Sequence, residues 1–395
     1  MLRPLTALAL LGSLAVQPRP ANDSWPAVAA TFHTRVKDAG IVGSSLLMVR
    51  DGAVVHQEFD GYQDLATKRP VDGETIFHWA SITKTFTGIA IMQLRDRGLL
   101  SLDDPVVKYV PELRQVHDPF GDIADVRIRH LMSHSAGFRA ATWPWGGDQP
   151  WHPFEPARWE QVVAMFPYTE LLFKPGTKYS YSNPGVIFLG RIVERLSGDD
   201  FEVYITKNIF MPLGMTRSFF DRAPYHLVEH RSHSYLRTDE GQFEGRFDFD
   251  TGITVSNGGL NAPLGDMAKY LAFLIGAPGP LTSRTGEGVL SRKSIEEMWT
   301  PQIRASAGEG ASGDEVQAGL SCFLERHHGV DLVGHSGDQN GFISHLYLHR
   351  PSRSGYVIAF NTDATGKVDQ RRTTRAVDAD VRDAIVDQLW KGNGR

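Results

Sequence analysis

The most constraining feature of this 395-residue sequence is that β-strand patterns gather toward both ends of the chain. Residues 44–49 and 53–59 are β-rich runs joined by Arg50-Asp51-Gly52, and Asp-Gly between apolar runs is a strong hairpin signal. Three further strand patterns follow late in the chain, at residues 331–334, 342–349 and 355–361, the last two joined by a turn at 351–355. Because hairpin partners are antiparallel, we expect one antiparallel sheet built from both chain ends.

Helical patterns flank and separate these strands. Residues 25–39 carry apolar side chains at helical spacing, and further helical runs are expected at residues 81–100, 186–196, 265–275 and 374–390. The predicted fold class is α/β (α+β), an antiparallel sheet flanked by helices with a mostly helical inserted domain. Residues 23–80 and about 280–395 form the predicted α/β part, and about 81–279 the helical part.

The first 22 residues indicate an export signal and a linker. One positive charge in Met1-Leu2-Arg3 is followed by an apolar run at 4–16, which is the pattern of a secretory signal and is too short to span a bilayer. We expect a secreted or periplasmic protein without a membrane span after signal removal. The alternative is a disordered or anchoring tail.

Charge and cysteine content exclude several classes. The formal net charge is −5 and the sequence has no basic stripe, so nucleic acid is not an expected partner. Its one cysteine, Cys322, can build neither a disulfide framework nor a thiolate metal cluster. Residues 319–323 are typical of a strand, and we expect Cys322 to be buried and inert. No cofactor and no metal are predicted.

The first candidate site is Ser81-Ile82-Thr83-Lys84, at the start of a predicted helix. Residues three apart on a helix share a face, so a hydroxyl and an amine meet there. Serine needs an adjacent base to act as a nucleophile, and a lysine with a lowered pKa can supply one. Helix starts also offer N–H groups to a developing oxyanion. The competing interpretation is a helix start with a solvated lysine.

A second candidate, Tyr181-Ser182-Asn183, lies between a Pro175-Gly176 turn and a predicted helix. A phenol beside a cation can relay a proton, and Asn183 can hold an amide-like group. The competing interpretation is a half-buried loop tyrosine.

The third candidate is Gly334-His335-Ser336-Gly337, which we interpret as a sharp turn at a sheet edge. Its backbone N–H groups can complete an oxyanion hole with that of Ser81. Asp338 stands where a Gly-x-Ser-x-Gly nucleophile elbow needs its last glycine, so Ser336 is not an elbow nucleophile.

Together the three motifs resemble the serine β-lactamase and penicillin-binding protein superfamily, and in particular its class C branch. That branch includes class C β-lactamases, D-Ala-D-Ala carboxypeptidases, D-aminopeptidases and β-lactamase-like esterases. Its second motif is Tyr-x-Asn and, in many members, its third is His-x-Gly. Flanking stretches also match, namely residues 75–77, 100–105, 130–137, 212–215 and 258–260, so the resemblance spans about residues 43–361.

The resemblance implies a β-lactamase/transpeptidase-like fold and a role for each motif residue. Ser81 is the implied acylated nucleophile, and Lys84 with Tyr181 the implied base and acid pair. Asn183 and His335 are implied substrate contacts, and the N–H groups of Ser81 and Asp338 an oxyanion hole formed with the Ser336-Gly337 segment.

One departure from the pattern bears on the substrate. Class C β-lactamases carry lysine where this chain has His335, which is mostly neutral at pH 7. The predicted function is a serine hydrolase that cleaves an ester, amide or lactam through an acyl-enzyme on Ser81, and His335 favours an esterase or a D-amino-acid peptidase-like enzyme over a dedicated β-lactamase. The expected partner is a small-molecule or peptide substrate, and the sequence does not determine the oligomeric state.

Two alternatives to a serine hydrolase stay open. A catalytically inactive binding or scaffold protein can use the same fold. His226-Leu227-Val228-Glu229-His230 spells the inverted zinc-protease motif, which would make a zinc hydrolase if a helix presents both histidines. His130 and His134 are interpreted as packing and hydrogen-bonding residues. The Trp-rich segment 139–159 either lines an acyl pocket or is a packed loop.

Overall fold

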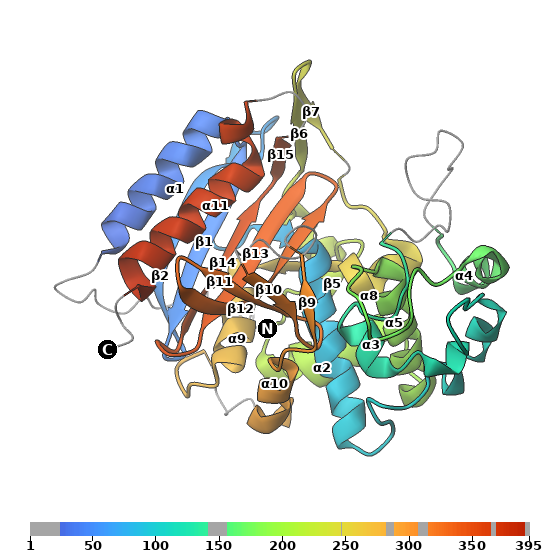
Figure 1. Ribbon diagram of the computed structural model, residues 1–395. Helices are drawn as coiled ribbons and strands as arrows, with labels where there is room; N and C mark the ends of the chain where they lie inside the picture. Colours follow the sequence, from blue (N-terminus) through green and yellow to red (C-terminus); the bar gives the residue numbers. More distant parts are fainter. Residues whose placement is uncertain are drawn as a thin grey trace, which may run out of the picture.

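The computed structural model describes residues 24–140, 156–245, 247–281, 288–306, 315–364 and 369–391. Its centre is a nine-stranded antiparallel sheet in the order β3-β2-β1-β14-β13-β12-β11-β10-β9 (Figure 1). The strands of this sheet are β1 Gly43–Arg50, β2 Ala53–Asp64, β3 Arg69–Pro70, β9 Ile303–Ala305, β10 Glu315–Ala318, β11 Phe323–His327, β12 Val330–Gln339, β13 Phe342–His349 and β14 Ser354–Phe360. Strand β1 pairs with β14, which confirms the prediction of one sheet built from both chain ends.

Helices cover both faces of this sheet (Figure 1). In sequence, all of the α-helices named here except the first and the last lie between β3 and β9. The helices are α1 Trp25–Ala39, α2 Thr83–Asp96, α3 Ile128–Met132, α4 Trp159–Met165, α5 Asn183–Ser197, α6 Phe201–Ile205, α7 Met211–Leu213, α8 Val255–Gly258, α9 Leu264–Ile275, α10 Arg292–Met298 and α11 Thr374–Ile385, which a π-helical turn, Val386–Trp390, extends. Two three-stranded sheets, β15-β6-β7 and β4-β8-β5, add to the fold. Their strands are β4 Ile76–His78, β5 Phe219–Phe220, β6 Tyr235–Thr238, β7 Gly241–Glu244, β8 Leu260–Pro263 and β15 Thr362–Ala364.

The central sheet is apolar on both faces because its strands alternate between two cores. In β1, Leu46 and Met48 lie in the core under α1 and α11, whereas Leu47 and Val49 belong to the larger core that includes α2 and α9. Figure 1 shows α1 and α11 side by side on one face of the sheet, with α2 and α9 on the other. Burial on both faces explains the uninterrupted apolar runs at residues 46–49 of β1 and 356–360 of β14.

The predicted hairpin between β1 and β2 is confirmed. Asp51 and Gly52 both adopt positive φ, at 49° and 71°, which is the conformation of a two-residue type I′ turn. The predicted helices at 25–39, 186–196 and 265–275 are likewise present as α1, α5 and α9.

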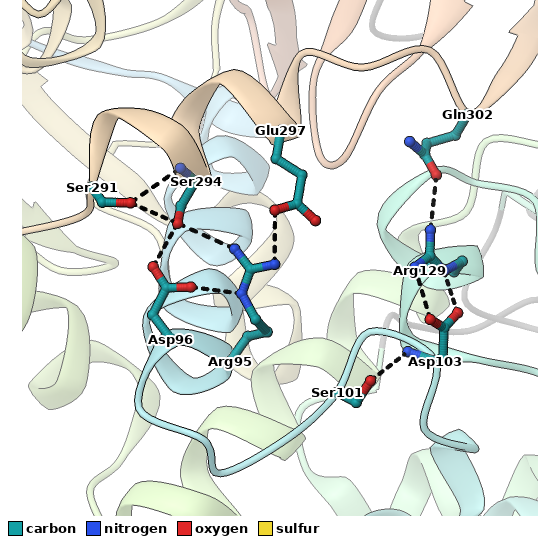
Figure 2. A network of polar contacts seen from close by, with 9 residues as sticks. All are labelled: Arg95, Asp96, Ser101, Asp103, Arg129, Ser291, Ser294, Glu297 and Gln302. Carbon is teal, nitrogen blue, oxygen red and sulfur yellow. Dashed lines mark hydrogen bonds and ion pairs between the residues drawn. The ribbon is translucent and has the colours of Figure 1, made fainter.

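A network of polar contacts fixes the far end of α2 (Figure 2). Arg95 on α2 donates to Glu297 on α10 at 2.8 Å, and Ser294 donates to Asp96 at 2.6 Å. Ser291 caps α10 through the backbone N–H of Ser294 at 3.1 Å. Since these contacts join α2 to a helix that follows it by almost 200 residues, they restrain the element whose first turn carries Lys84.

Figure 2 also shows an ion pair made by Arg129, the residue directly before the 130–137 segment. Arg129 on α3 pairs with Asp103, through Nε at 2.6 Å and Nη2 at 3.0 Å. Its Nη1 also reaches the side chain of Gln302 at 3.4 Å.

Two local predictions are wrong. The expected turn at Gly334-His335-Ser336-Gly337 is the middle of β12, paired with β13 over Val333–Gln339. The glycines serve close packing instead: a Cβ on Gly334 would lie 2.2 Å from the carbonyl oxygen of Leu346. Cys322 is buried as expected, but it precedes β11 rather than lying in a strand.

The helix predicted over 81–100 is present with different bounds. The chain there forms a 3-10 turn, η1 Ala80–Ile82, followed by α2, which ends at Asp96. Among the described residues no helix is long and apolar enough to cross a membrane. The expected signal segment at 1–22 lies outside the described residues.

Candidate active site

Ser81 lies in the turn η1, directly before α2. Ala80 has a φ of 45°, which is strained for a residue with a side chain; such strain is typical of functional sites. Trp79 fixes the entry to the turn, because its backbone N–H donates to Leu260 at 2.8 Å and its indole N–H to Ala262 at 2.9 Å. The Ser81 residue keeps partial exposure, whereas Trp79 and Ala80 are buried.

Lys84 is almost fully buried, at 1% exposure. Its Nζ donates to Oγ of Ser81 and to the carbonyl oxygen of Asn257, each at 2.9 Å. The predicted meeting of hydroxyl and amine is therefore present. Burial disfavours the charged form of an amine, so this location suits a lysine that acts as a base.

The segment that supplies the Asn257 carbonyl is tied to the same turns of α2. Thr87 donates to the carbonyl oxygen of Ser256 at 2.6 Å, and Thr83 Oγ1 accepts the N–H of Leu260 at 3.1 Å. Asn257 also donates from its side chain to the carbonyl oxygen of Asn183 at 3.4 Å. One short segment thus connects the Ser81–Lys84 turn with the start of α5.

Tyr181 comes from a loop about 100 residues further along the chain and reaches the same place. The centre of its ring lies 5.0 Å from Nζ of Lys84, and it is 7% exposed. Ser182 caps α5 by accepting the N–H of Gly185 at 3.1 Å, so Asn183 begins the helix beside Tyr181. The structure therefore brings Ser81, Lys84 and Tyr181 together, with Asn183 next to them.

Strand β12 lies against the Ser81 turn. A Cβ on Gly337 would lie 2.2 Å from the carbonyl oxygen of Trp79, so only glycine permits this approach. Strand β11 pairs with β12 only up to Gly334. Among the described strands, none pairs with the outer edge of His335–Gln339, the stretch that holds Ser336 and Asp338. The backbone of that edge can therefore hydrogen-bond to a substrate.

His335 is buried in this site, at 1% exposure, with its ring centre 6.3 Å from that of Tyr181. Burial is the main cause that lowers the pKa of His335 to about 3. The neutral ring contacts the carbonyl oxygen of Ser336 through Nδ1 at 2.6 Å, which makes Nδ1 the protonated nitrogen. Nε2 is then an acceptor, and it has no hydrogen-bond partner among the described residues.

Two contributors to this site were not identified as such from the sequence. The carbonyl of Asn257 has no residue-type signature, although Gly258-Gly259-Leu260 beside it matched the family pattern. His134, interpreted as a packing residue, stacks on the ring of Tyr181 with centres 4.4 Å apart. Its 130–137 segment was also among the matching stretches.

The zinc interpretation lacks support. Tyr225–His230 is a 3-10 helix, with three residues per turn, so His226 and His230 do not share a face. In the described parts of the chain, no group of three or more His, Cys, Asp or Glu side chains is arranged to hold a metal. Of the Trp-rich segment, residues 141–155 lie outside the described residues, and Trp159 is buried against Phe166 and Phe188.

Comparison with known proteins agrees with this architecture. The chain is 25% identical to Protein flp of Staphylococcus aureus (strain COL) over 346 residues, 88% of this chain and 65% of that protein. It thus spans just under two thirds of that relative. A penicillin-binding protein homologue from Pyrococcus abyssi, described as octameric, superposes with a TM-score of 0.73 at 28% identity, covering 93% of this chain and 79% of that one.

The fold is also that of the D-amino acid amidase from Ochrobactrum anthropi SV3, with a TM-score of 0.74, 22% identity and coverage of 93% of this chain and 99% of that one. The family model described as Beta-lactamase matches residues 28–381. Because that match covers nearly the whole described chain, the protein belongs to the beta-lactamase family, within the serine β-lactamase and penicillin-binding protein superfamily.

Proposed function

We propose that this protein is a serine hydrolase that cleaves an ester or amide through an acyl-enzyme on Ser81. The observation that carries the proposal is the 2.9 Å contact between Nζ of Lys84 and Oγ of Ser81, with the ring of Tyr181 5.0 Å from that nitrogen. A nucleophile, a base in contact with it and a second proton carrier are the groups that acyl transfer requires. An inactive scaffold has no need to keep all three in one buried cluster.

In the proposed reaction, neutral Lys84 takes the proton of Ser81 as its oxygen attacks the carbonyl carbon. The oxyanion is held by backbone N–H groups of Ser81 and Asp338. When the bond to the leaving group breaks, Tyr181 and Lys84 return the proton to that group. A water molecule, deprotonated by the same pair, then attacks the acyl carbon. The bond from that carbon to Oγ of Ser81 breaks, the pair returns the proton to Oγ, and the acid is released.

The neutral side chain of His335 favours a substrate that places no carboxylate beside it. A neutral imidazole whose free nitrogen is an acceptor binds an N–H or O–H donor, and it offers no charge to a carboxylate. This favours simple esters and amides, including D-amino acid amides, over β-lactams. The fold that this chain shares with a D-amino acid amidase is consistent with an amide substrate of that kind.

The test is a parallel assay of p-nitrophenyl butyrate, a D-amino acid amide and nitrocefin, on the wild type and on Ser81→Ala. We expect hydrolysis of the ester or the amide by the wild type only. Mass spectrometry after treatment with a fluorophosphonate should find one adduct, on Ser81. Undiminished hydrolysis by Ser81→Ala would refute the proposal.

A further inference from the structure

Tyr181 lies in a segment with no regular secondary structure. Residues 179–182 belong to neither a helix nor a strand, so no helix or strand fixes the direction of the phenol. A proton carrier must nevertheless be held within a fraction of an ångström. The contacts around Tyr181 therefore have to supply the order that its backbone lacks.

His134 makes three contacts that bracket this one residue. Its carbonyl oxygen accepts the N–H of Ser180 at 2.8 Å, and its Nδ1 accepts the N–H of Ser182 at 3.1 Å. Its ring stacks on that of Tyr181, with centres 4.4 Å apart and planes 30° apart. The residues on either side of Tyr181, and Tyr181 itself, are thus all held by His134.

His134 is itself firmly held. It is 4% exposed and has a φ of 54°, a conformation that its neighbours fix. The N–H of Ser135 donates to the carbonyl oxygen of His130 at 2.8 Å, and the N–H of Ser321 donates to that of Met132 at 2.7 Å. Burial lowers the pKa of His134 far below its usual value, so the ring stays neutral and Nδ1 keeps the lone pair that accepts the N–H of Ser182.

We infer that His134 is a positioning residue, which holds the phenol of Tyr181 in the orientation needed for proton transfer with Lys84 and Ser81. This inference rests on the proposed function, since it assigns Tyr181 a proton to carry. His134 acts only through Tyr181 and does not touch the reacting atoms.

Two substitutions separate the two kinds of contact. His134→Asn keeps a side-chain acceptor and tolerates a positive φ, but removes the ring. His134→Phe keeps a flat ring and leaves the N–H of Ser182 without its acceptor. We expect each to lower kcat for p-nitrophenyl butyrate about 10- to 100-fold, with KM changed by less than about threefold.

A matched control comes from the same segment. Nδ1 of His130 accepts the N–H of Arg127 at 3.2 Å, so His130→Asn is the same substitution at a capping site away from Tyr181. We expect it to leave kcat unchanged within about twofold. Thermal unfolding of each variant identifies any that fails to fold, and His134→Asn is the variant expected to tolerate the site best.

The decisive measurement is a double-mutant cycle with Tyr181→Phe. Because His134 acts through the phenol, His134→Asn should cost little further activity once that phenol is gone. A folded His134→Asn variant with normal kcat, or the same loss in the Tyr181→Phe background, would overturn the inference. Failure of the proposed function is distinct, since Ser81→Ala would then retain activity.

Discussion

The amine of Lys84 and the hydroxyl of Ser81 meet at 2.9 Å across one turn of chain, and the same amine also donates to the carbonyl oxygen of Asn257. A buried amine with two acceptors and an aromatic ring beside it is an unusual place for a lysine. This relationship is the basis of the first prediction.

Ser81→Ala and Lys84→Ala should each lower kcat about 10³-fold or more, because nucleophile and base act as one unit. For the same reason the double variant should lose little more than either single variant. Steady-state kinetics with p-nitrophenyl butyrate measures both effects. Near-normal turnover by Lys84→Ala would contradict its role as base.

Gly337→Ala should damage the site by pushing β12 away from the Ser81 turn. A new Cβ would lie 2.2 Å from the carbonyl oxygen of Trp79 and 2.6 Å from Oγ of Ser344, and a backbone atom cannot rotate away. We expect a loss of about 10²-fold in kcat/KM and of about 1–3 kcal/mol in unfolding free energy.

The control for that variant is Gly288→Ala. Nothing lies within 4 Å of a Cβ built on Gly288, so activity and stability should stay at wild-type values. Equal activity of the two alanine variants would show that the close approach of β12 is not needed.

His335→Lys should shift substrate preference toward carboxylates. It replaces a neutral acceptor with a cation, and a hydrogen bond between charged partners contributes about 1.5–3 kcal/mol. The ratio of kcat/KM for nitrocefin to that for p-nitrophenyl butyrate should rise about 10-fold or more. His335→Gln, which stays neutral, should leave the ratio near its wild-type value; an equal rise in both variants would argue against a charge effect.

Acid should destabilise the protein between about pH 6.5 and 4. Burial lowers the pKa of His78 from its usual 6.5 to about 4, so the unfolded chain binds a proton there that the folded protein does not. The resulting stability is complete above pH 6.5 and is lost as the pH falls, by up to about 1.4 kcal/mol per pH unit.

Urea unfolding at pH 7, 6, 5 and 4 measures this slope. His78→Gln removes the titrating group that contacts Asn261 and Gln339, and its stability should fall less steeply with acid. Part of the slope should remain in that variant, because the pKa values of the buried His134 and His335 are also lowered. Parallel curves for wild type and variant would contradict the prediction.

The sequence by itself determined the features that depend on near neighbours. Asp51 and Gly52 encode a turn because their preference for positive φ is local. Ser81 and Lys84 meet because three residues of helical backbone bring them together. The two-ended sheet was also predictable, since strand patterns joined by short turns gather toward both ends of the chain and hairpin partners are antiparallel.

Only the tertiary structure decided which distant groups complete the site. Gly334 and Gly337 suggested a turn, but they lie inside a strand, where the backbones of β13 and of Trp79 come too close for a side chain. The Asn257 carbonyl reaches Lys84, and the His134 ring reaches Tyr181, across 173 and 47 residues of chain. Such contacts depend on how whole elements pack in the core, and local sequence patterns carry no record of that packing.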